Sequence, residues 1–138
     1  RATSSLQITS RSEFSMIQNV KIVVVDKDKL VRDFTVDVLE FCVNREVLSF
    51  DNGGDAWDYL QTPDNAHVII FDAEIPIMNG FDLLKKIKEK FPEKICIIMS
   101  HQYQNEKIAK ELGADAFLAK PFYIDELFEL VQQYVVAA

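Results

Sequence analysis

Five short runs rich in β-branched and aromatic residues alternate along this chain with five segments of helical periodicity. The runs lie at residues 22–25, 46–50, 68–71, 95–99 and 116–118. The runs at 22–25, 68–71 and 95–99 are apolar at every position, which is typical of strands covered on both faces. Strands that alternate with helices pair in parallel through right-handed crossovers. The sequence therefore predicts an α/β fold, a doubly wound five-stranded parallel sheet with helices on both faces.

The segments between these runs carry apolar residues at spacings of three and four, the period of an amphipathic helix. We expect each set to form the buried stripe of its helix: Leu30, Phe34, Val38 and Phe41; Leu83, Leu84 and Ile87; Ile108 and Leu112; and Ile124, Leu127, Phe128 and Val131. Gly53 and Gly54 begin the segment that carries Trp57 and Leu60, and Gly113 lies where the fourth helix should stop. These glycines mark expected helix boundaries.

The composition fits one globular domain. The chain has 138 residues, 49% of them apolar and 27% charged, and we expect the domain to span residues 20–138. Residues 1–19 are rich in Ser and Thr and form either a vector-derived leader or a native linker. The net charge of −7 argues against direct nucleic-acid binding. No apolar run approaches the roughly 18 residues of a membrane span, so we expect a cytoplasmic protein without a membrane partner.

Polar side chains follow four of the five predicted strands at the point where each strand ends. Asp26 and Asp72 follow the first and third strands, Ser100 follows the fourth, and Lys120 follows the fifth. In open parallel sheets, ligands bind beyond the carboxyl ends of the strands, near the point where the strand order reverses. We therefore expect two carboxylates, a hydroxyl and an ammonium to converge at one edge of the sheet.

The segment from Asp72 to Gly80, with Pro76 between them, closely resembles the phosphoacceptor loop of response regulator receiver domains. The resemblance extends, in the family's order, to residues 24–26, 99–100, 113–118 and 120–122, and it covers residues 20 to about 136. On these motifs the chain resembles the CheY-like superfamily of two-component signal transduction. That resemblance implies the flavodoxin-like strand order 2-1-3-4-5.

The resemblance implies that Asp72 takes a phosphoryl group from a histidine kinase or a phosphotransfer protein and that the domain then switches its output face. A carboxylate can attack phosphorus, and the acyl phosphate adds charge that a cation must neutralise. Lys120 would supply this cation, with a cis bond to Pro121 that aims the ammonium into the site. Ser100 would be the switch hydroxyl that hydrogen-bonds the phosphoryl group. Phe117 would be the aromatic residue whose rotamer changes with the position of that hydroxyl. Such a domain is a phosphoacceptor and not an ordinary enzyme.

The same resemblance implies a Mg²⁺ ion held by Asp26, Asp72 and the backbone carbonyl of Glu74. The second acid of the family's metal-binding pair is replaced here by Lys27. An ammonium cannot coordinate Mg²⁺, and its charge repels the ion, so we expect metal binding to be weakened. Lys27 could instead form an ion pair with Asp72 in the metal's place. Asp28 could replace the lost ligand only in part, because a shift of one residue at a helix start turns the side chain by about 100°.

Two further residues are expected to tune the pocket. Glu74 lies where the family's residue faces the path of the hydrolytic water, and His101 stands where the family often has a small residue. We expect His101 to be partly exposed at the pocket rim. The resemblance also implies that a partner or a second copy of the chain docks on the face formed by the fourth helix, the fifth strand and the fifth helix.

Two other functions are compatible with parts of this pattern. Lys27 and Glu74 favour a pseudo-receiver, an interaction module that keeps the fold without being phosphorylated, although the intact Asp72 opposes it. Residues 26–28 also resemble the nucleophile motif of haloacid-dehalogenase-type phosphatases. That function would leave Pro76 and Gly80 unexplained, and no late acidic pair follows a further apolar strand.

Overall fold

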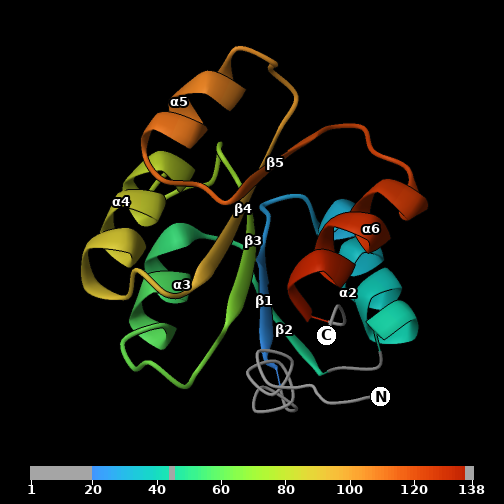
Figure 1. Cartoon of the computed structure of the whole chain (residues 1–138), viewed down its shortest axis with the longest axis horizontal. Coiled ribbons are helices and arrows are strands. Elements are labelled where there is room, and N and C mark those ends of the chain that lie inside the picture. Colours follow the sequence, from blue (N-terminus) through green and yellow to red (C-terminus); the bar gives the residue numbers. More distant parts are fainter. Residues whose placement is uncertain (1–19, 44–45, 136–138) are drawn as a thin grey trace, which may run out of the picture.

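The computed structural model describes residues 20–43 and 46–135, so the predicted leader or linker at 1–19 lies outside the described residues. Five parallel strands form one sheet in the order β2-β1-β3-β4-β5 (Figure 1). The strands are β1 (Ile22–Val25), β2 (Val47–Phe50), β3 (Val68–Asp72), β4 (Ile95–Ser100) and β5 (Ala116–Ala119). The helices are α2 (Lys29–Val43), α3 (Gly53–Tyr59), α4 (Gly80–Lys90), α5 (Asn105–Glu111) and α6 (Ile124–Val135). The predicted flavodoxin-like α/β fold is confirmed.

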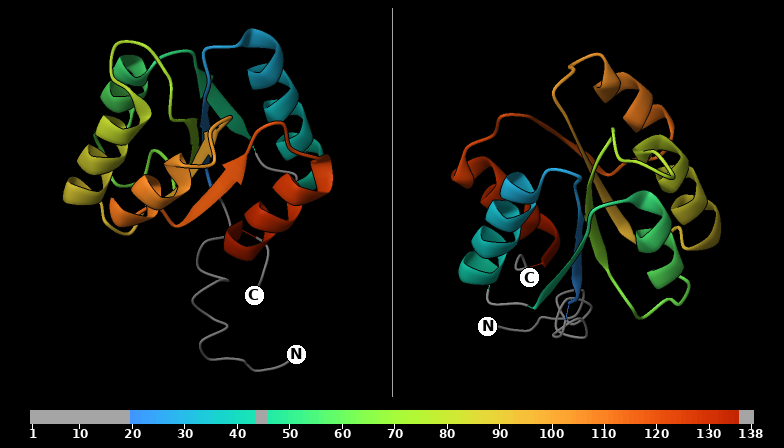
Figure 2. Two further views of the ribbon diagram at one scale, coloured as in Figure 1. Left: turned by 90° about the horizontal axis from the view of Figure 1, so that it is seen from above. Right: turned by 180° about the vertical axis from the view of Figure 1, so that it is seen from behind.

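The helices cover the sheet in two layers. Helices α3, α4 and α5 pack on one face, and α2 and α6 pack on the other (Figure 2). The chain leaves β1 toward β2 on one side and returns to β3 on the other, so the strand order reverses between β1 and β3. Val25 pairs with Phe71 at this point. Asp26 and Asp72 therefore emerge side by side at the position where such sheets bind ligands.

The central strands consist of apolar residues because helices cover them on both faces. Every residue of β1 and β3 is buried. Strands β3 and β4 each extend one residue beyond the predicted run, so Asp72 and Ser100 are the last residues of their strands. The backbone of these two residues is thus held by the hydrogen bonds of the sheet, which fixes the positions from which their side chains extend. Among the described helices, none is long and apolar enough to cross a bilayer.

The predicted buried stripe of α2 is wrong for three of its four members. Val38 is buried, but Leu30, Phe34 and Phe41 are 81%, 44% and 89% exposed. The buried side of this helix runs through Thr35 and Leu39, one position along from the predicted stripe. One position in a helix is a rotation of about 100°. The helix has more apolar residues than it can bury, and the spacing of the larger ones pointed to the wrong side.

The other helices follow the predicted stripes more closely. Leu83, Leu84 and Ile87 of α4 are fully buried, as predicted, and so are Leu127 and Val131 of α6. The stripes are wrong at their margins: Ile108 is 42% exposed and Ile124 is 50% exposed. Helix α5 buries the small Ala109 instead, which allows its backbone to approach the sheet closely. The predicted stops also hold, since Gly113 has a φ of 98° directly after the cap residue of α5.

The loop between β3 and α4 crosses the carboxyl edge of the sheet under tight steric constraints. A Cβ at Gly80 would overlap the carbonyl oxygen of Asp72, so only glycine fits there. Ile77 has a φ of 73°, in the left-handed region that is costly for a β-branched residue. Its side chain is 83% exposed and regains little free energy by burial. The loop therefore stores backbone strain at Ile77.

Replacing Ile77 with Asn should raise the free energy of unfolding by about 1 kcal/mol, because Asn tolerates the left-handed conformation. Urea denaturation of the wild type and the variant measures this difference. Ile75 is the matched control, since it lies in the same loop but is 5% exposed. Ile75→Asn should lose about 2 kcal/mol by burying an amide in the core. A lower unfolding free energy for Ile77→Asn would contradict the assignment of strain.

Candidate functional site

Two buried carboxylates and one ammonium meet at the carboxyl edge of the sheet. Asp26 directly follows β1 and Asp72 ends β3, and their exposed fractions are 1% and 6%. Lys120 directly follows β5, and its Nζ lies 2.6 Å from Oδ2 of Asp26 and 2.5 Å from Oδ2 of Asp72. The peptide bond between Lys120 and Pro121 is cis. The ammonium thus bridges the ends of three strands.

The remaining carboxylate oxygens are held by backbone N–H groups. The N–H of Asp28 donates to Oδ1 of Asp26 at 2.9 Å, and the N–H of Glu74 donates to Oδ1 of Asp72 at 2.7 Å. Each carboxylate therefore has one oxygen on the shared ammonium and one oxygen on the loop that follows its own strand. This arrangement holds both carboxylates in place before any ligand arrives.

The charge state of Lys120 depends on its two partners. Burial by itself lowers the pKa of Lys120, but the hydrogen bonds that its ammonium donates to Asp26 and Asp72 outweigh that effect and raise the pKa above its ordinary value of 10.5. The ammonium therefore stays charged at neutral pH. With two carboxylates and one ammonium, the cluster keeps one net negative charge.

Ser100 lies on the neighbouring strand end with its hydroxyl fully engaged as an acceptor. Its exposed fraction is 2%. Its Oγ accepts hydrogen bonds from the backbone N–H of Gln102 at 3.0 Å and from Nδ2 of Asn105 at 2.9 Å. Phe117, the predicted switch aromatic, is half-buried on β5 and packs with the core under α3, α4 and α5. The sequence carried no signal for Asn105, because a polar residue at a helix start is ordinarily exposed.

Lys27 does not form the ion pair with Asp72 that was considered from the sequence. It is exposed and forms no ion pair with any residue that the structure describes. The predicted alternative, an ion pair between Lys27 and Asp72, is therefore absent, and Lys120 occupies that position. Lys27 lies on a loop open to water, where its ammonium stays hydrated. Lys120 is brought to the carboxylates by the strand before it.

Asp28 is committed to the start of helix α2. Its Oδ1 accepts hydrogen bonds from the backbone N–H groups of Leu30 at 3.0 Å and Val31 at 3.3 Å, which is the role of an N-cap. Moving this carboxylate toward a metal would release those two N–H groups. Asp28 is therefore not available to replace the acid that Lys27 displaces.

The donors at this edge are a poor fit for Mg²⁺. A hard cation of this kind needs several oxygen ligands in a near-octahedral arrangement. The described residues hold no group of three or more acidic, histidine or cysteine side chains able to bind a metal. The two carboxylates present, Asp26 and Asp72, already share an ammonium. A metal would have to compete with Lys120 while gaining only the Glu74 carbonyl and water.

Two exposed loops frame the mouth of the site. Glu74 is exposed, and its Oε2 accepts a hydrogen bond from Nε2 of Gln102 at 3.2 Å, which links the loop after β3 to the loop after β4. His101 is exposed and lines a hollow of about 270 Å³ together with Lys120 and Phe34. Glu74 and His101 are thus exposed on the loops that follow β3 and β4, and their predicted roles in tuning the pocket stay predictions.

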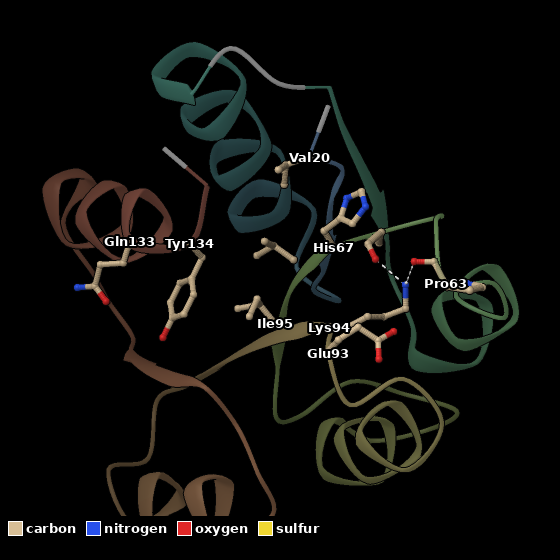
Figure 3. Close-up of a pocket in the computed structure, with 10 residues that line it drawn as sticks. Val20, Pro63, His67, Glu93, Lys94, Ile95, Gln133 and Tyr134 are labelled. Atoms are coloured by element: carbon tan, nitrogen blue, oxygen red, sulfur yellow. Dashed lines mark hydrogen bonds between the residues drawn. The ribbon is translucent and has the colours of Figure 1, made fainter. Parts of the chain in front are cut away.

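A larger cavity of about 480 Å³ lies at the opposite edge of the sheet, where His67 and Tyr134 are among its lining residues (Figure 3). Its one deeply buried charge is Lys94, whose pKa is lowered by burial. Nζ of Lys94 donates to the carbonyl oxygens of Pro63 at 3.0 Å and Ala66 at 2.5 Å. The lysine therefore joins two loops of the fold, and we place the functional site at the carboxyl edge.

Replacing Lys120 with Met should lower the free energy of unfolding at neutral pH by about 3 kcal/mol, because it leaves two buried carboxylates uncompensated. Since the folded-state pKa of Lys120 is raised, the stabilisation by its charge should be complete below pH 10.5 and lost as the pH rises further. Urea denaturation across this pH range measures both effects. Lys29→Met is the control: it removes an exposed partner of Asp33 and should change little. Equal effects of the two substitutions would contradict the importance of the buried cluster.

Comparisons with known proteins agree with this geometry. The sequence profile of the response regulator receiver domain matches residues 22–132. A CheY-like receiver domain protein from Methanospirillum hungatei is 26% identical, with a TM-score of 0.77 over 85% of this chain and 94% of that chain. The receiver domain of the Francisella response regulator 1452 is 30% identical, with a TM-score of 0.76 over 83% and 95%.

A third similar structure is the BeF3-activated receiver domain of DrrB, a Thermotoga maritima protein. It is 25% identical, with a TM-score of 0.72 over 86% of this chain and 98% of that chain. The phosphatase alternative finds no support in the family match. The chain belongs to the response regulator receiver domain family of two-component signalling.

Proposed function

We propose that Asp72 is the residue that accepts the phosphoryl group. Family membership makes the chain a phosphoacceptor domain with a histidine kinase partner, and not a classical enzyme. The observation that carries the assignment to Asp72 is its position at the strand-order reversal, with the Lys120 ammonium on one oxygen. Ser100 ends the adjacent strand. No other carboxylate among the described residues combines these neighbours with the loop that ends at Gly80.

The transfer itself follows from the charges at the site. A carboxylate oxygen of Asp72 attacks phosphorus while the bond from phosphorus to the donor's histidine nitrogen breaks, and that nitrogen keeps the electron pair. Asp72 loses its negative charge in the new acyl bond, and the phosphoryl group brings about two. Lys120 then pairs with a phosphoryl oxygen as a point charge. The Ser100 hydroxyl, whose hydrogen is free to donate, hydrogen-bonds the same group and signals its presence.

The exposed apolar side chains around the site indicate where partners dock. Leu30 and Phe34 lie beside the hollow that reaches Lys120, so they offer the phosphoryl donor a surface next to Asp72. Tyr103 and Tyr123, in the loops that lead into α5 and α6, are 76% and 77% exposed and adjoin the face formed by α5, β5 and α6. We assign output and self-association to this second face.

A pseudo-receiver is the second candidate, and the poor metal donors favour it. Receiver domains typically bind Mg²⁺, whereas the third acid here is replaced by the exposed Lys27. A domain of this kind would keep the Lys120 cluster as a permanent structural element. The two candidates share a fold and differ only in whether Asp72 is modified.

Incubation with acetyl phosphate should add one phosphoryl group, about 80 Da, to the intact protein, and Asp72→Asn should abolish the gain. Asp51→Asn is the matched control, because Asp51 also directly follows a strand, β2, but is exposed and forms no ion pair with Lys120. Intact-mass spectrometry measures the mass gain of the wild type and of both variants. Labelling that persists in Asp72→Asn would exclude Asp72, and no labelling of the wild type would establish the pseudo-receiver.

Replacing Lys27 with Asp should tighten Mg²⁺ binding at least about tenfold, or 1.4 kcal/mol, because it removes a repulsive charge and restores an oxygen ligand. Without metal the variant should melt at a lower temperature, since three carboxylates would share one site. Titration calorimetry and thermal denaturation measure these changes. Lys29→Asp makes the same charge change two residues away and should leave affinity nearly constant. If both variants bind Mg²⁺ like the wild type, Lys27 does not limit the metal site.

A further inference from the structure

Asn105 is a buried amide at a position where helices normally face water. It is the first residue of α5 and is 9% exposed, whereas its neighbours Gln104 and Glu106 are exposed. Gln104, the cap residue before it, makes no side-chain cap bond. Nδ2 of Asn105 points back toward the sheet and donates to Oγ of Ser100. This buried amide is thus committed to the hydroxyl at the end of β4.

Helix α5 has few other attachments to the core. Only Asn105 and Ala109 of its seven residues are buried. The connection from Ser100 to the helix runs through residues 101–104, all of which are exposed. The hydrogen bond between Asn105 and Ser100 is therefore the buried link between the end of β4 and the first turn of α5.

The two hydrogen bonds that Ser100 Oγ accepts fix the direction in which the hydroxyl can donate its hydrogen. A hydroxyl has two acceptor lone pairs and one hydrogen to donate. Both acceptor positions are used, by the N–H of Gln102 and by Nδ2 of Asn105, so only the hydrogen remains. If Oγ turns or shifts to aim this hydrogen at a phosphoryl oxygen on Asp72, the Asn105 amide must follow it or be left buried without a partner. An unpartnered buried donor is costly, so the helix start moves with the hydroxyl.

We propose that Asn105 is a positioning residue that transmits the state of the Ser100 hydroxyl to helix α5. This inference rests on the proposed phosphorylation of Asp72, and it adds the route by which the phosphoryl group reaches the output face. Asn105 does not touch the reacting atoms. It acts through Ser100 and places the first turn of α5 according to where that hydroxyl points.

The link can be tested first without phosphorylation. Asn105→Ala should accelerate amide hydrogen exchange in α5 about fivefold to tenfold, as expected when one buried hydrogen bond is lost. In the Ser100→Ala background the same substitution should change exchange by less than about twofold, because the bond is already absent. Gln104→Ala is the matched control and should have no effect. Equal acceleration by Asn105→Ala in both backgrounds would overturn the link.

Transmission is tested in the protein incubated with acetyl phosphate. In the wild type, a mass gain should be accompanied by at least about a threefold change in hydrogen exchange of the α5 amides, within the range of local opening equilibria. Asn105→Ala should gain the same mass without this change in exchange. Asn105→Leu, which keeps the side-chain volume but has no amide, should behave like Asn105→Ala.

The outcomes separate this inference from the proposed function. A mass gain with unchanged α5 exchange in the wild type, or a full response in Asn105→Ala, overturns the role of Asn105 and leaves phosphorylation of Asp72 standing. The absence of any mass gain overturns the proposed function and the transmission with it. A response that is present in the wild type and lost in both Asn105 variants supports the inference.

Discussion

The ion cluster of Lys120 with Asp26 and Asp72 is the interaction on which the carboxyl edge of this sheet depends. Two carboxylates that emerge side by side from β1 and β3 would repel each other in a buried setting. The single ammonium offsets this repulsion and also ties β5 to two strands with which it forms no sheet pairing. The loops after β1 and β3 complete the arrangement through one backbone N–H each. Geometry and charge at the site are thus set together.

This charge balance is also the reason why we expect a weak metal site. The oxygens that would bind a cation are already paired with an ammonium, and Asp28 is held by the start of α2. The exposed Lys27, next to Asp26 in the sequence, adds a positive charge that repels an incoming cation. Lys120 would therefore have to neutralise most of the charge of a phosphoryl group. With a third acid at residue 27 a metal ion could share this role, so the phosphoryl transfer is expected to be less favourable in this chain.

Much of the fold could be predicted because hydrophobic periodicity reports burial on both faces of a strand. The runs of β1, β3 and β4 indicated a covered parallel sheet, and Gly53 and Gly113 marked helix boundaries. The same signal failed for α2, where Leu30 and Phe41 have the spacing of a core stripe but lie in water. Periodicity identifies an apolar side of a helix, but which side meets the sheet is decided by packing around smaller residues such as Thr35.

The sequence by itself determined which polar residues follow the strands, because parallel strands bring their carboxyl ends to one edge. It also determined the loop from Asp72 to Gly80 through its resemblance to the phosphoacceptor loop, and the structure added the steric overlap that admits only glycine at residue 80. The resemblance already assigned the cation at Asp72 to Lys120. Only the tertiary structure decided that this ammonium also reaches Asp26 and that Lys27 stays exposed, since that depends on which ammonium is buried. It likewise decided that Asn105 turns inward to Ser100. A hydrogen bond between a strand end and a helix start depends on their separation in space, which local sequence does not specify.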